Sequence, residues 1–191
     1  EILINKKIRI SNNILIDEFV IDKEQKKWGK AHGLAFSNRL NWSTNIHGDY
    51  IFSVYGSYIF VGTHTFRHEE GYNNFVQRDK TLGWEYGSDG NEFEIGANYY
   101  NYDNLIYNIH AEWINLGSNS ILYNHYSPYE DYTKSTFPSG NIKRLFNLKG
   151  RVQWWHKSGN SVFSEIKFQK DAGLLEFVFG IHMFIPKRLE F

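Results

Sequence analysis

Residues 174–186 alternate between two kinds of side chain, one residue at a time. Successive side chains of a β-strand point to opposite faces of its sheet, so a pattern of period two predicts a strand. One face of this strand is mixed and includes Glu176 and His182. The segment is too short and too charged for a membrane-spanning helix, but its length suits a tilted transmembrane β-strand. The other face is entirely apolar and consists of Leu175, Phe177, Phe179, Ile181, Met183 and Ile185.

The same alternation recurs along the chain and predicts nine strands in all. The strands before the last are expected at residues 7–10, 14–21, 33–45, 50–65, 91–100, 105–115, 143–155 and 161–169. Short clusters of Asn, Asp, Gly and Ser predict tight turns at 11–13, 47–49, 102–104 and 158–160. The polar positions often carry full charges, which predicts a wet or salt-bridged inner face. These positions are Arg39, Glu92, Glu94, Glu112, Lys149, Arg151, Glu165, Lys167 and Glu176.

The connections between the predicted strands alternate in length. Long loops are expected at 22–32, 67–90 and 117–141, and the connections between them are short. In an up-and-down barrel, short turns on one rim and long loops on the other are typical of outer-membrane proteins. We therefore expect one domain over residues 1–191, an antiparallel up-and-down transmembrane β-barrel in the bacterial outer membrane. Bacterial barrels have an even number of strands, so nine strands predict a C-terminal portion of a larger barrel.

A β-sandwich in water is the main alternative, because its strands alternate in the same way. Three features favour the membrane barrel. Aromatic residues lie near the predicted strand ends, the loops alternate in length, and the chain has only 3 prolines.

Composition excludes several other classes. Lys plus Arg and Asp plus Glu are equal at 21 each, so no basic surplus indicates nucleic-acid binding. Cysteine is absent, which excludes disulfides and thiolate metal sites. No apolar run is long enough for a transmembrane helix, and the first residues do not resemble a signal peptide.

The loop at 67–90 carries the most unusual chemistry. Aromatic residues stand there beside amides, an arginine and carboxylates. Apolar sugar faces stack on aromatic rings, and planar polar groups hydrogen-bond sugar hydroxyls, so this composition predicts a polysaccharide site. The alternative is a plug whose charges pair with those of the barrel interior. The candidate binding residues are Tyr72, Asn74, Arg78, Trp84, Glu85, Tyr86 and Asp89.

This loop also carries a resemblance to a known family. The strings FRHEEGYNNF and LGWEYGSD between residues 66 and 89, followed by EFEIG, resemble the capsule-assembly Wzi family. The segment ILIDE at 14–18 resembles one that precedes this region in many members, whereas Trp84 stands where histidine is common. The resemblance implies an outer-membrane barrel larger than this chain, acting as a surface lectin that helps to attach capsular polysaccharide.

The expected function is therefore non-enzymatic binding or anchoring of surface polysaccharide, with outer-membrane lipid as a second partner. No H-E-x-x-H metal motif and no G-x-S-x-G nucleophile motif occurs, and we expect no cofactor or metal. A channel, a structural subunit of a larger surface or secretion assembly, and a soluble extracellular β-sandwich lectin remain the alternatives.

Overall fold

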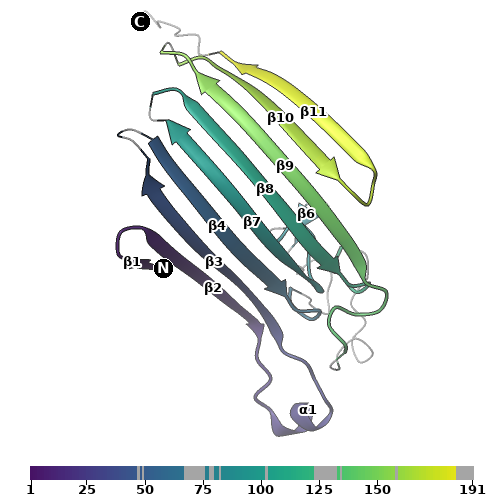
Figure 1. Ribbon diagram of the computed structural model, residues 1–191. Coiled ribbons are helices and arrows are strands. Elements are labelled where there is room, and N and C mark those ends of the chain that lie inside the picture. Colours follow the sequence, from purple (N-terminus) through teal and green to yellow (C-terminus); the bar gives the residue numbers. More distant parts are fainter. Residues whose placement is uncertain are drawn as a thin grey trace, which may run out of the picture.

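The computed structural model describes residues 1–46, 48, 50–66, 76–77, 80–81, 83–101, 103–122, 133, 135–157 and 159–183. Within these residues, nine strands form one antiparallel sheet in which each strand pairs with the next along the chain (Figure 1). They are β1 (Ile2–Ile4), β2 (Ile8–Glu18), β3 (Gly33–Asn45), β4 (Tyr50–Val61), β7 (Gly90–Asn101), β8 (Leu105–Leu116), β9 (Lys143–Trp155), β10 (Ser161–Gln169) and β11 (Leu174–His182). The all-β meander predicted from the sequence is confirmed.

The sheet is open. Strands β1 and β11 form its two edges, and hydrogen bonds do not close it into a barrel within the described residues. A separate two-stranded hairpin consists of β5 (Val76–Gln77) and β6 (Lys80–Thr81).

The connections lie at the two ends of the sheet as predicted (Figure 1). Short turns at one end, which we call the turn end, join β3 to β4, β7 to β8 and β9 to β10. The long connections lie at the other end, which we call the loop end, together with the tight β10–β11 turn. The predicted loop at 22–32 contains a five-residue helix, α1 (Lys23–Lys27), whose first turn is capped by the Asp22 carboxylate. No helix in the described part of the chain is long and apolar enough to cross a membrane.

The first predicted turn is wrong. Residues 11–13 lie inside β2, where Asn12 pairs with Asn38 of β3, and the Asn13 side chain donates a hydrogen bond to the Ser37 hydroxyl at 3.2 Å. The chain reverses instead at residues 5–7, where Asn5 and Lys6 have φ angles of 45° and 58°. Polar residues that suit a turn also suit a strand when a polar partner faces them on the neighbouring strand.

Burial is inverted relative to a sheet that folds in water. On β8, Ile109 is 54% exposed, whereas Glu112 on the opposite face is only 7% exposed. The buried apolar core is small and lies at the loop end, where Ala35, Val61, Phe66 and Ile121 pack together. The apolar face of the sheet is therefore exposed, and the polar face is the more enclosed of the two.

Candidate functional site

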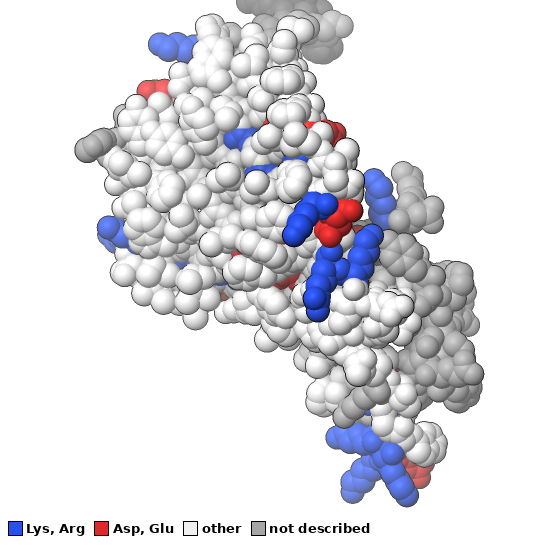
Figure 2. All heavy atoms as spheres, turned by 45° about the vertical axis from the view of Figure 1, so that its right-hand side comes forward, with Lys and Arg blue, Asp and Glu red and all other residues white. Residues whose placement is uncertain are grey.

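One face of the sheet, which we call the apolar face, carries continuous apolar rows across all nine strands. The strand register aligns one such row from Ile2 through Leu40, Ile95 and Leu148 to Leu175. The next row along the strands crosses all nine strands in the same way and again holds only apolar residues and glycine. Its members are Ile4, Ile8, Trp42, Val54, Ala97, Ile109, Gly150, Ile166 and Phe177. Figure 2 shows a broad area without charged residues, with Lys, Arg, Asp and Glu mainly toward its margins.

Aromatic side chains border these rows at both ends of the strands. At the turn end, the rings of Tyr50 and Tyr99 lie 5.7 Å apart and those of Tyr99 and Tyr107 lie 5.9 Å apart. At the loop end, Trp113 lies 5.8 Å from Phe93 and 5.3 Å from Phe146. We call these groups the turn belt and the loop belt. Tyr99 lies six positions after Phe93 on β7, a separation of about 20 Å along the strand.

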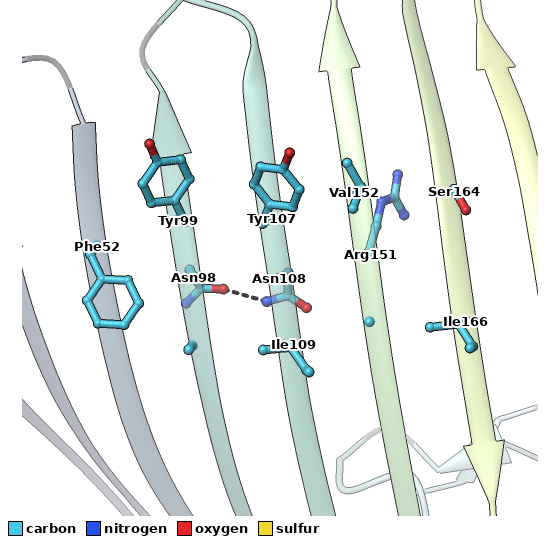
Figure 3. Close-up of a pocket in the computed structure, with 12 residues that line it drawn as sticks. Phe52, Asn98, Tyr99, Tyr107, Asn108, Ile109, Arg151, Val152, Ser164 and Ile166 are labelled. Carbon is cyan, nitrogen blue, oxygen red and sulfur yellow. Dashed lines mark hydrogen bonds between the residues drawn. The ribbon is translucent and has the colours of Figure 1, made fainter.

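A shallow groove of about 390 Å³ lies within the apolar face (Figure 3). Small residues form its floor at Ala97 and Gly150, and a Cβ atom added to Gly150 would lie 3.3 Å from the Ile166 side chain. Tyr99 and Tyr107 stand side by side at one end, and their hydroxyls point toward the turn end of the strands (Figure 3). The groove is lined almost entirely by apolar side-chain surface, as an alkyl chain would require.

The opposite face, which we call the polar face, is held by hydrogen bonds and ion pairs that run from strand to strand. Glu112 accepts hydrogen bonds from Lys149 at 2.9 Å and from Asn147 at 3.1 Å, both on β9. Glu165 forms ion pairs with Arg151 at 3.4 Å and with Lys167 at 3.1 Å. Charges in the middle of this face are therefore compensated by partners on the same or neighbouring strands.

Glu94, His110 and Glu112 form the one group in the described residues whose side chains could together ligate a cation. Glu94 already accepts hydrogen bonds from the Tyr55 hydroxyl at 2.5 Å and from Ser57 at 3.1 Å. In Glu112, the oxygen that faces His110 at 3.2 Å also faces the Lys149 ammonium. A cation would compete with that ammonium, so the arrangement is that of an internally paired network.

Asp89 holds segments of the chain together at the loop end through its carboxylate. Its side chain is fully buried and accepts hydrogen bonds from the Thr63 hydroxyl at 2.7 Å, the Asn119 amide at 2.9 Å, and both the amide and the hydroxyl of Ser139. Its own backbone has a φ of 61°. Asp89 was predicted to bind sugar, but its two oxygens are occupied by protein donors. It joins the connection between β4 and β7, which contains Thr63, to both ends of the connection between β8 and β9.

Three other predicted binding residues, Trp84, Glu85 and Tyr86, precede Asp89 in the same connection. The Trp84 indole N–H donates to Glu92 at 2.7 Å, and its ring meets Tyr86 edge-on at 5.2 Å. Burial, followed by the nearby Glu85 carboxylate, raises the pKa of the Tyr86 hydroxyl, so it stays protonated and able to donate a hydrogen bond. Glu85 itself is exposed. The remaining predicted residues, Tyr72, Asn74 and Arg78, lie outside the described residues.

A hollow of about 470 Å³ opens beside Trp84 at the loop end. Phe66, Ile59 and the Trp84 ring line it together with two polar side chains, Asn13 and Ser37. An aromatic ring beside an amide and a hydroxyl is a combination that can stack on a sugar and bond its hydroxyls.

Comparisons of the chain with protein-family models, with curated proteins and with solved structures find no match. The resemblance to the Wzi family therefore stays a prediction. Sequence reasoning missed a second hollow, which is polar and lies at the turn end. Its cations come from β3 and from the region of the β1–β2 turn. Only the strand register brings these segments together.

Proposed function

We propose that this chain forms part of the wall of an outer-membrane β-barrel. The observation that carries the proposal is the inverted burial, with uninterrupted apolar rows on an exposed face and compensated charges on the more enclosed one. In water such a face would be an exposed apolar patch spanning the whole sheet, whereas lipid is its natural solvent. The two aromatic belts support the same reading, because aromatic girdles flank the apolar band of such barrels.

The strand lengths also suit a bilayer. Strands β2 to β11 of the main sheet contain 9 to 13 residues each, and a tilted strand needs about 9–11 to cross the hydrocarbon layer. Within that layer an unpaired strand edge leaves backbone groups without partners, at a cost of several kcal/mol each. We therefore propose that further strand pairing, at β11 and along the part of β2 that β1 leaves unpaired, closes a barrel larger than this sheet.

Membrane extraction tests the proposal. Membranes from cells that produce the protein are washed at alkaline pH and then treated with detergent. We expect the protein to stay in the membrane during the wash and to dissolve only in detergent. Release of folded protein by the wash alone would support the soluble sandwich instead.

We further propose that the loop end binds surface polysaccharide. The support is the hollow beside Trp84, where an aromatic ring, an amide and a hydroxyl converge, on a platform that the Asp89 hydrogen bonds hold together.

Substitution at Trp84 tests this second proposal. Trp84→Ala should weaken retention of polysaccharide at the cell surface, and Trp84→Phe should keep part of it because a ring remains. Trp28→Ala is the matched control, because Trp28 is 65% exposed beside α1 and does not line the hollow. Equal retention in all three variants, at equal amounts of folded protein, would contradict a polysaccharide site at Trp84.

A further inference from the structure

A second hollow, of about 500 Å³, lies on the polar face at the turn end. Four cationic side chains line it, two from the β1–β2 turn, one from β2 and one from β3. They are Lys6, Lys7, Arg9 and Arg39. Glu1 is the only carboxylate among the described residues that line this hollow, and it forms an ion pair with Arg9 at 2.9 Å.

This surplus of positive charge is local. Elsewhere on the polar face, Lys149, Arg151 and Lys167 each lie next to Glu112 or Glu165. In the turn-end hollow, four cations share one carboxylate, so the net charge of the lining side chains is positive. Positive charges gathered in a concave surface attract an anionic ligand more strongly than the same charges on a convex one.

The remaining lining groups narrow the chemistry of that ligand. Ser11, Asn41 and Ser43 offer hydroxyls and an amide, and the Tyr100 side chain adds an aromatic ring. Arg39 is held in place, because its guanidinium carbon lies 3.7 Å from the centre of the Tyr55 ring. A stacked arginine presents its N–H groups in a fixed plane, which suits the two oxygens of a carboxylate.

We propose that the turn-end hollow binds an acidic saccharide, a sugar ring that bears a carboxylate. The arginines and lysines bind the carboxylate, the serines and Asn41 bind the hydroxyls, and Tyr100 packs on the ring. This inference rests on the proposed polysaccharide function and names its substrate class. It places an acidic-sugar site at the end of the sheet opposite to Trp84.

Binding to the purified full chain in detergent tests the inference, with tetragalacturonate as the acidic probe and galactotetraose as the neutral one. We expect the acidic probe to bind at least about tenfold more tightly, with an affinity that falls as salt is raised. Arg39→Gln and Lys7→Gln should each weaken its binding by about tenfold. Lys7 lies in an exposed turn, so its variant tests charge without disturbing the Arg39–Tyr55 contact.

Lys167→Gln is the matched control, because it removes one positive charge from the same face outside the hollow. It should leave binding unchanged. Equal affinity for the two probes, or an equal loss in the control, would overturn the inference. If the acidic probe binds and only the Trp84 variants weaken it, the loop-end proposal stands and the turn-end site falls. No binding of either probe would contradict both.

Discussion

The inverted burial of apolar and polar side chains can be followed in single residues. Along β8, Ile109 faces outward while Glu112, three positions later, is enclosed by Asn147, Lys149 and His110. A buried carboxylate costs free energy unless it is hydrogen-bonded and paired, and here it is both. An isoleucine side chain that is exposed to hydrocarbon instead of water adds no unfavourable free energy to the folded state. Both choices are consistent with a lipid environment on the apolar face.

The exposed isoleucine gives a sharp prediction at this scale. In water, Ile109→Arg would be close to neutral, because an exposed side chain changes little. On a lipid face between the two belts, the same change should lower the free energy of unfolding by about 2–4 kcal/mol. Urea unfolding of the protein in lipid vesicles measures the difference. Leu105→Arg on the same strand and face is the control, since it lies at the turn end, where the cost should be at most about 1 kcal/mol.

Asp89 gives a second prediction at the scale of residues. Asp89→Ala leaves several buried donors from Thr63, Asn119 and Ser139 without an acceptor, so stability should fall by about 3 kcal/mol. The loop that contains Asn119 should also become sensitive to limited proteolysis. Asp103→Ala, in an exposed turn at the other end of the sheet, should change neither property. Unaltered proteolysis in Asp89→Ala would show that Asp89 does not hold the loops.

At the scale of elements, the alternating pattern predicts the strands closely. Residues 33–45, 143–155 and 161–169 were expected as strands and are β3, β9 and β10 with the same bounds. The pattern fails where local turn chemistry competes with pairing, as at Asn12 and Asn13, whose partners on β3 are not visible from the sequence. It also misses α1, because five residues are too few to show a helical period.

The placement of the connections predicts a membrane topology. The turn end should face the periplasm and the loop end the cell exterior, which is the arrangement of outer-membrane barrels. The chain has no cysteine, so single cysteines can be introduced at Lys26 in α1 and at Asp103 in the β7–β8 turn. An impermeant thiol reagent on intact cells should label the Lys26 variant and leave the Asp103 variant unlabelled. The reverse pattern would overturn the orientation.

At the scale of the whole molecule, the sequence predicts the class of sheet but not the geometry of its sites. It proposed Trp84, Tyr86 and Asp89 as binding residues of one loop, and the structure places all three at the loop end, where the Trp84 and Tyr86 rings are in contact. The sequence does not show that Asp89 is buried and hydrogen-bonded by protein donors, whereas Trp84 of the same loop lines a hollow. The burial of Asp89 depends on segments that are distant in the sequence, such as the one that contains Ser139. The turn-end hollow could not be predicted from the sequence for the same reason, since only the strand register brings Lys6 and Arg39 to the same hollow.

The central claim is that the apolar face of the sheet contacts lipid. Spin labels attached to single cysteines, introduced one at a time over residues 105–113 of β8, test it most directly in vesicles of reconstituted protein. Collisions with membrane-dissolved oxygen should be frequent at 107, 109 and 111 and rare at 106, 108 and 110, following the period of two. Collisions with a water-soluble nickel chelate should be lowest at 109 and 111, which lie between the belts. Frequent collisions of the label at 109 with the nickel chelate would show that this face lies in water, and would contradict the claim.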